Sequence, residues 1–233
     1  MERLTLADRV YDAIRSRILS RSIAQGARLN IDSLASELGV SQTPVREALA
    51  RLEEVGLVVS EPYIGSRVKL ITPREITDIY QVRSVLEPLA IRLFVQVASG
   101  QDIELLRKLL QEEERAVACA DDEPHRAHVS YSYHTLIADA CGNAVLAEFI
   151  RQAVDRSEMF WAAARELYPE VASDRGWGLM RNKEHWRLLG ALERRSADDA
   201  LAVLMPHLDA ITNRLARTVS DWDDPPGAGE ERQ

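Results

Sequence analysis

A tight turn between two short amphipathic stretches constrains this chain more than any other feature. The first stretch, Leu34–Leu38, ends at Gly39, and the second, from about Ser41 to Val55, carries apolar side chains at helical spacing. A glycine at this point predicts the left-handed residue that ends a helix, and Pro44 fits the first turn of the next one. Two helices joined in this way form a helix-turn-helix, whose second helix enters the major groove of DNA.

The flanking residues extend this motif into a winged helix-turn-helix. A helix is expected from Thr5 to about Ser20, because Thr5 and Asp8 have the spacing of a capping pair and the apolar residues that follow lie on one face. Two β-prone runs, residues 57–61 and 67–71, are separated by turn residues and predict a hairpin, the wing.

The chain after Thr72 has the pattern of helices. Thr72, Pro73 and Glu75 form a helix-start signal. Helices are expected over residues 76–97, 101–121, 125–140, 143–167, 179–194 and 197–219, with a kink at Pro88 and a looser connection at 168–177. The predicted fold class is therefore mainly α: an N-terminal winged helix-turn-helix with a small β-hairpin, plus a C-terminal all-α antiparallel bundle of about six helices.

The sequence divides into two domains and a tail. We expect a DNA-binding domain at residues 1–71, an all-helical domain for effector binding and dimerisation at 72–220, and a disordered tail, rich in Pro, Gly and Glu, at 221–233. The net charge is −8, yet the first 70 residues hold 10 basic and 9 acidic side chains, so the excess acid lies in the helical domain. The N-terminal domain is therefore the part suited to contact phosphate.

Three features predict a cytoplasmic protein with no membrane partner. The sequence has no apolar run near the ~20 residues that cross a bilayer, its start lacks an export signal, and its cysteines, Cys119 and Cys141, form no CxxC motif. Both thiols are expected to be reduced and to fill apolar space.

Two longer motifs resemble known domains. Residues 6–70 resemble the winged-helix domain of GntR-family transcription regulators, through Val40–Leu49, Arg51-Leu52-Glu53, Gly56-Leu57-Val58, Gly65 and Val68. Residues 73–218 are similar to the all-helical ligand-sensing domain of the FadR subgroup, the FCD domain, through Arg83–Glu87, His134 ahead of Cys141–Leu146, Glu184-His185 and His207. Together the two resemblances cover nearly the whole chain.

The second helix of the turn motif has one face for packing and one for DNA. Its packing face is expected to hold Val45, Ala48, Leu49 and Leu52. Its exposed tip then holds Ser41, Gln42, Thr43 and Arg46. Gln42 can pair with adenine and Arg46 with guanine, whereas the hydroxyls can hold phosphate at the helix N-terminus.

The resemblance adds Gly65, which lets the wing approach the minor groove. Two positions depart from the family, because Gln42 stands where arginine is common and Asp32 where a basic residue is common. The alternatives for the tip are that Arg46 pairs with an acid such as Glu47 on the surface and that Ser41 is merely a cap.

Three histidines of the helical domain, His134, His185 and His207, are expected on three separate helices. Taken singly, each is more typical of a core or surface residue, but the resemblance implies that they converge on a divalent transition metal ion, Zn or Ni. The aspartate that completes the family's site is replaced here by Ser130, so weak metal binding or none is an open alternative. His125 and His128 lie off this face and are expected on the surface.

The resemblance also places Arg83 in an effector pocket, where its guanidinium would hold a carboxylate. Tyr133, Arg151 and Asn182 are further candidates for that pocket. The alternative for Arg83 is an ion pair with Glu87 on the helix surface, worth ~0.3–0.5 kcal/mol. The aromatic residues expected to serve packing are Tyr80, Phe94, Phe149, Phe160 and Trp161.

These patterns predict a transcription regulator, a homodimer that binds double-stranded operator DNA under the control of a small carboxylic-acid effector. A metal-dependent hydrolase built on the three histidines is the alternative, but the chain has no HExxH motif. A protein–protein adaptor that uses the winged helix as a scaffold is a third class.

Overall fold

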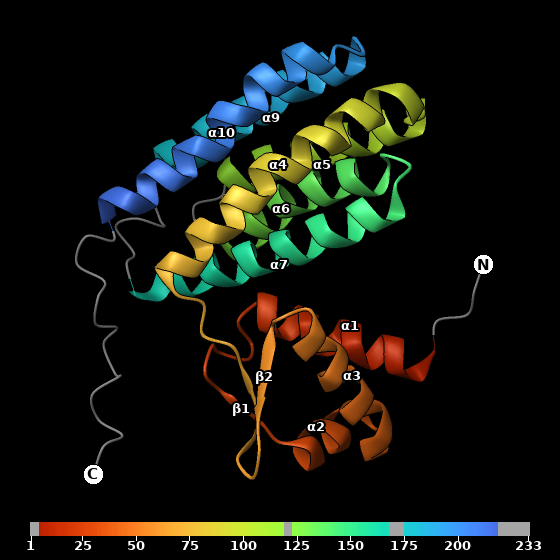
Figure 1. The fold of residues 1–233 in the computed structure, drawn as a ribbon, viewed down its shortest axis with the longest axis vertical. Helices are drawn as coiled ribbons and strands as arrows, with labels where there is room; N and C mark the ends of the chain where they lie inside the picture. The colour runs from red at the N-terminus through yellow and green to blue at the C-terminus, as the bar shows by residue number, and fades with distance from the viewer. Residues whose placement is uncertain (1–4, 119–122, 168–174, 219–233) are drawn as a thin grey trace.

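The computed structural model describes residues 5–118, 123–167 and 175–218. Three helices and a small sheet form one body, the head, and six longer helices form the bundle beside it (Figure 1). The head contains α1 (Leu6–Leu19), β1 (Arg28–Leu29), α2 (Ile31–Leu38), α3 (Gln42–Glu54), β2 (Val58–Glu61) and β3 (Gly65–Val68). The bundle contains α4 (Pro73–Val97), α5 (Gly100–Ala118), α6 (Glu123–Asp139), α7 (Ala144–Leu167), α9 (Arg175–Glu193) and α10 (Ala197–Thr218).

Local signals set the helix ends of the head where the sequence predicts them. Thr5 and Asp8 form a complete capping box at the start of α1. The side chain of Asn30 accepts from the Ser33 amide at the start of α2, and Gly39 ends that helix with φ +66°. The predicted packing face of α3 is buried, which confirms the amphipathic pattern of the turn motif.

The sheet differs from the predicted hairpin in two ways. β1 adds a third strand, and the antiparallel order is β1-β3-β2, with Arg28 opposite Arg67 and Leu29 opposite Ser66. A strand of two residues is too short to show alternation, so the sequence carries no signal for it. β3 also spans Gly65–Val68 rather than 67–71, because the ladder with β2 begins directly after the turn, at Gly65 opposite Glu61.

The bundle follows the predicted pattern with one correction. Thr72 caps α4 through the Glu75 amide, 3.2 Å away, and α4 continues through Pro88. The predicted loose connection at 168–177 is wrong at its end, because α9 already begins at Arg175, and its first part, 168–174, lies outside the described residues. Glycine costs a helix about 1 kcal/mol, and here Gly176 and Gly178 are tolerated because Trp177 packs against the core.

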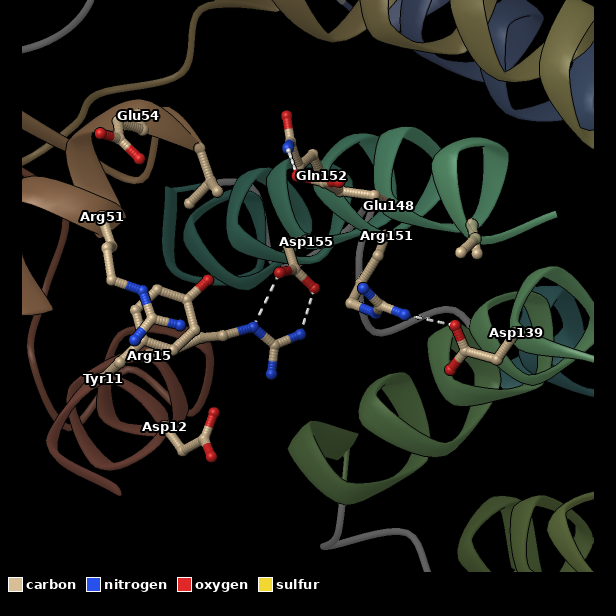
Figure 2. A pocket seen from close by; sticks show the side chains of 13 residues that line it. Tyr11, Asp12, Arg15, Arg51, Glu54, Asp139, Glu148, Arg151, Gln152 and Asp155 are labelled. Atoms are coloured by element: carbon tan, nitrogen blue, oxygen red, sulfur yellow. Dashed lines mark hydrogen bonds and ion pairs between the residues drawn. The ribbon is translucent and has the colours of Figure 1, made fainter. Parts of the chain in front are cut away.

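The head docks on one segment of α7. Arg15 of α1 makes two hydrogen bonds to the buried Asp155 carboxylate, one of them 2.7 Å long (Figure 2). Arg156 donates from Nε to the Val55 carbonyl at 2.8 Å, and Gln25 donates to the Met159 carbonyl at 2.7 Å. Two consecutive turns of α7 therefore contact α1, the C-terminal end of α3 and the loop that contains Gln25.

Gly56→Ala tests this docking. Both Gly56 (φ +76°) and Gly39 (φ +66°) have left-handed backbones, so alanine costs roughly 1–2 kcal/mol of folding free energy at either. At Gly56 the new Cβ would also lie 2.4 Å from Arg156 Nη2, whereas nothing lies within 4 Å at Gly39. Arg156 would have to give up its bond to Val55, about 1 kcal/mol more.

Urea denaturation of Gly56→Ala and the matched control Gly39→Ala measures the difference. We expect Gly56→Ala to lose more stability than Gly39→Ala. Equal losses would show that the Arg156 contact contributes nothing to docking.

Candidate DNA-reading tip and three-histidine centre

The N-terminus of α3 presents a polar tip, defined here as Ser41, Gln42, Thr43 and Arg46. All four residues are exposed, while Val45 and Ala48 between and after them are fully buried. Ser41 occupies the N-cap position but makes no side-chain capping bond to α3, which goes against the alternative that it is merely a cap. The free N–H groups of the first turn therefore point outward with these side chains.

A short chain of hydrogen bonds orders the tip. Arg46 donates from Nη2 to Gln42 Oε1 at 3.1 Å, and Gln42 donates from Nε2 to the Asp32 carboxylate of α2. Arg46 thus contacts Gln42 rather than Glu47. Asp32 fixes which way the Gln42 amide points and adds a negative charge beside the tip.

The wing is the hairpin of β2 and β3, and its turn exposes side chains that the sequence did not single out. Gly65 has φ +102°, and Tyr63 before it is fully exposed with φ +68°. Arg28 reaches across from β1 to the Ile64 carbonyl, and Arg67 pairs with Glu61. Arg28 lies opposite Arg67 because β1 pairs with β3. The sequence did not predict β1, so it had no signal that would place these two arginines together.

In the bundle, the three-histidine centre consists of His134 from α6, His185 from α9 and His207 from α10. All three are buried, and each ring offers one nitrogen such that the three nitrogens lie within 4.8 Å of one another. The ring centroids are 4.7 to 5.4 Å apart. Three residues far apart in the sequence therefore meet in the middle of the bundle.

A glutamate holds the outer nitrogen of each imidazole. Glu87 of α4 lies 2.9 Å from His134 Nδ1, Glu113 of α5 lies 3.0 Å from His185 Nδ1, and Glu184 of α9 lies 2.8 Å from His207 Nδ1. A carboxylate accepts, so each Nδ1 carries the proton and each Nε2 keeps a lone pair. This is the outer-shell arrangement that orients histidine ligands around metals.

The lone pairs of the centre face one another. His185 Nε2 lies 3.3 Å from His207 Nε2, and His134 Nε2 is buried with no hydrogen-bond partner among the described residues. Burial lowers the pKa of His134 to about 4, although Glu87 raises it, and burial likewise lowers the pKa of His207 well below its usual value. Three imidazoles with convergent lone pairs fit a divalent transition metal ion with open positions for other ligands.

Ser130 lies on α6 beside a carboxylate from another helix, Glu113 of α5. The Glu113 carboxylate accepts hydrogen bonds from Ser130 and from Asn182 Nδ2, 3.0 Å away. Burial raises the pKa of Glu113, but His185 and these two bonds outweigh burial and lower it to about 2. Glu113 is therefore ionised and supplies negative charge next to His185.

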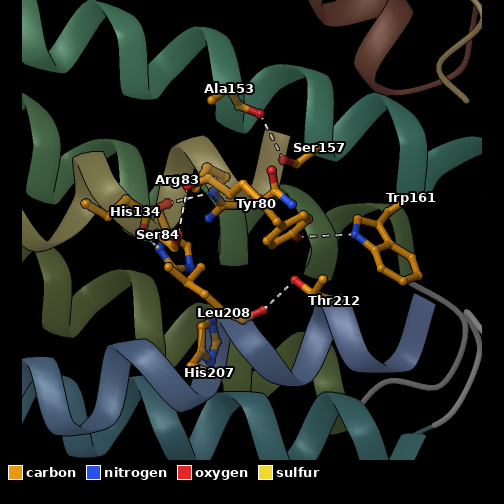
Figure 3. A network of polar contacts seen from close by, with 12 residues as sticks. Tyr80, Arg83, Ser84, His134, Ala153, Ser157, Trp161, His207, Leu208 and Thr212 are labelled. Atoms are coloured by element: carbon orange, nitrogen blue, oxygen red, sulfur yellow. Dashed lines mark hydrogen bonds and ion pairs between the residues drawn. The ribbon is translucent and has the colours of Figure 1, made fainter. Parts of the chain in front are cut away.

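Arg83 lies inside the bundle and not on its surface. Its side chain is fully buried and pairs with Glu87 at 2.6 Å, so the structure rules out the alternative of a weak pair on the helix surface. Nη1 and Nη2 of Arg83 have no hydrogen-bond partner among the described residues, and the guanidinium lies 4.7 Å from the Tyr80 ring. Figure 3 shows Arg83 between Tyr80 and His134. Two terminal nitrogens therefore remain for an anion.

The other predicted effector residues separate into two places. Tyr133 stacks on His185 with centroids 4.9 Å apart, and Asn182 bonds Glu113, so both belong to the centre. Arg151 does not, because it pairs with Asp139 at the far edge of a groove of about 760 Å³ between head and bundle (Figure 2).

The packing expectations hold with one exception. Tyr80, Phe94, Phe160 and Cys141 are buried, and Trp161 is partly buried against the core. Phe149 is 58% exposed, so the expectation that it packs inside is wrong. Residue Cys119 and the side chains of His125 and His128 lie outside the described part of the chain. Within that part, every helix is too short or too polar to cross a membrane.

Comparison with known proteins gives consistent results along the chain. Residues 6–68 match the bacterial regulatory proteins of the gntR family, and residues 78–210 match the FCD domain. The HTH-type transcriptional regulator YdhC of Bacillus subtilis (strain 168) is 28% identical over 211 residues, which are 91% of each chain. The Uxu operon transcriptional regulator of Escherichia coli (strain K12) is 28% identical and covers 92% of this chain and 90% of its own. The structure of E. coli McbR/YncC superposes with a TM-score of 0.78 at 23% identity, over 93% of this chain and 99% of that one.

Glu113→Gln tests the role of the outer carboxylates. An amide in place of the carboxylate can donate to His185 Nδ1. The imidazole proton then moves to Nε2, which no longer has a lone pair for a metal. We expect Zn²⁺ or Ni²⁺ affinity to fall about 10–100-fold, measured by calorimetric titration of the metal-stripped protein. His185→Ala, which removes the ligand itself, serves as the reference for complete loss, and unchanged affinity in Glu113→Gln would contradict the assignment.

Proposed function

Because this chain belongs to the GntR family of bacterial regulatory proteins and carries an FCD domain, we propose that it is a homodimeric regulator whose operator affinity is set by a small carboxylic acid. The chain is a transcription regulator with a ligand-sensing C-terminal domain and not an enzyme, since its relatives and its fold are those of regulators. The hydrolase alternative finds no support. The division into a head and a sensing domain near Thr72 is part of the proposal.

The polar tip supports the proposal on the DNA side and carries it. Gln42 and Arg46 are exposed, ordered and placed at a helix N-terminus, as direct readout of a purine edge requires. Ser41 and Thr43 are placed to hold phosphate beside them. Gly65 in the wing allows close approach to the minor groove, and Arg28 and Arg67 lie where they would contact the flanking backbone.

The outer face of the bundle supports a homodimer. α4 leaves Val82, Val85 and Leu89 exposed at 47 to 71%, and α7, which packs against α4, leaves Val145 and Phe149 exposed. Exposed apolar side chains grouped on adjoining helices are typical of protein interfaces. A two-fold dimer would present two polar tips to the halves of a near-palindromic operator.

The centre of the bundle supports an acid as effector. Arg83 offers two buried nitrogens without partners among the described residues, beside imidazoles that fit a metal. His134, His185 and His207 would hold Zn²⁺ or Ni²⁺, and such an ion supplies Lewis acidity toward an oxygen ligand. The carboxylate of the acid would then be bound by the Arg83 guanidinium.

One stretch of α7 supports a route from the centre to the head. Asp155 and Arg156 hold the head, and six residues past Asp155 the Trp161 indole donates to the Tyr80 hydroxyl at 3.3 Å (Figure 3). The Tyr80 ring in turn lies against Arg83. An acid that shifts Arg83 can thus bias the position of α7 and with it the head, provided that it binds one arrangement better.

Arg46→Ala should abolish specific operator binding and leave folding intact. The lost guanine contact is worth about 1–3 kcal/mol at that base pair, and the exposed side chain contributes little to stability. Fluorescence anisotropy with operator and random duplex measures specificity, and thermal unfolding measures folding. Arg92→Ala, an exposed arginine of α4, is the control, and unchanged operator affinity in Arg46→Ala would remove the tip from the proposal.

Asp155→Asn should uncouple the acid from DNA. The amide keeps the shape but loses the charge that binds Arg15, so α7 keeps only the Arg156 and Gln25 contacts to the head and the head follows it less closely. The acid should still raise the melting temperature, while its effect on operator affinity, commonly about 5–150-fold in allosteric proteins, should shrink toward none. Asp139→Asn breaks the exposed pair with Arg151 in the same groove and should keep the coupling. Full coupling in Asp155→Asn would exclude this route.

A further inference from the structure

A second arginine already contacts the three-histidine centre. Arg181 of α9 lies one turn before His185, and its Nη2 is 2.9 Å from His207 Nε2. The Glu184 carboxylate accepts from His207 Nδ1, so Nε2 is an acceptor and Arg181 is the donor. The lone pair that a metal would need on His207 is therefore occupied by an N–H group of this chain.

The guanidinium of Arg181 has two further features besides its contact with His207. Its Nη1 is buried with no hydrogen-bond partner among the described residues, and the guanidinium lies 5.8 Å from the Trp177 ring. Glu184, on the same helix, balances charge on the far side of His207. An arginine remains charged under all ordinary conditions, so the centre always has a positive group beside it.

A metal ion and this guanidinium cannot share His207. A nitrogen lone pair accepts one partner in this direction, and two cations a few ångströms apart repel strongly in a buried site. Arg181 thus has to leave His207 Nε2 before that atom can act as a ligand.

We propose that Arg181 is the resident counter-cation of the three-histidine centre and competes with a divalent metal for His207. This inference rests on the proposed metal centre and deepens it, because it makes metal affinity an adjustable property set by one side chain. In the metal-free protein Arg181 satisfies His207, and metal uptake requires Arg181 to move away.

Cobalt titration of the full-length protein tests the competition. Co²⁺ alone is added to the wild type, to Arg181→Met and to Arg181→Lys, and binding is followed by calorimetry and by the visible absorption of the ion. Methionine fills similar space without charge, so Arg181→Met should bind Co²⁺ at least about tenfold more tightly than the wild type. Arg181→Lys keeps a cation and should stay close to the wild type.

A matched control and a second readout keep the outcomes separate. Arg187→Met changes an exposed arginine of the same helix and should leave Co²⁺ affinity unchanged. Equal or weaker Co²⁺ binding by Arg181→Met, or no binding by any variant, overturns the proposal. Tighter binding by both Arg181→Met and Arg181→Lys also overturns it, because the gain would then come from a smaller side chain and not from the lost charge. Operator binding by the wild type, measured in parallel, tests the proposed function independently.

Discussion

The pairing of each buried imidazole with a carboxylate organises the bundle. Glu87, Glu113 and Glu184 fix the Nδ1 protons of three histidines, and this choice of tautomer turns the three Nε2 lone pairs toward one another. Convergent lone pairs repel unless a cation lies between or beside them. The geometry of the centre therefore favours a positively charged group beside the three Nε2 atoms.

Two arginines and their carboxylate partners supply charge around the three-histidine centre. Arg83 is balanced by Glu87 and keeps two unpartnered nitrogens within the described structure, whereas Arg181 contacts His207 directly. Buried ion pairs of this kind contribute little net stability, because desolvation costs about as much as attraction returns. Their value here is positional, since they hold charged groups beside the three-histidine centre.

α7 joins this interior to the head. The side chains of Asp155 and Arg156 bind the head, and Trp161 reaches Tyr80, which lies against Arg83. A continuous series of side-chain contacts along α7 therefore runs from Arg83 to the head.

The sequence alone determined most of the helices and several of their ends, because caps and glycines act within a few residues: Thr5, Gly39 and Thr72 each end or begin a helix where predicted. It also singled out the polar tip and the three histidines, the latter through resemblance. It could not find the roles of Glu113, Arg181 and Arg28, and it misplaced Phe149 and Arg151, because these depend on how the helices and strands pack. Glu113 meets His185 from 72 residues away, and Arg181 meets His207 from 26 residues away. Periodicity assigns a residue to a face of its helix, but only the packed structure decides what that face meets.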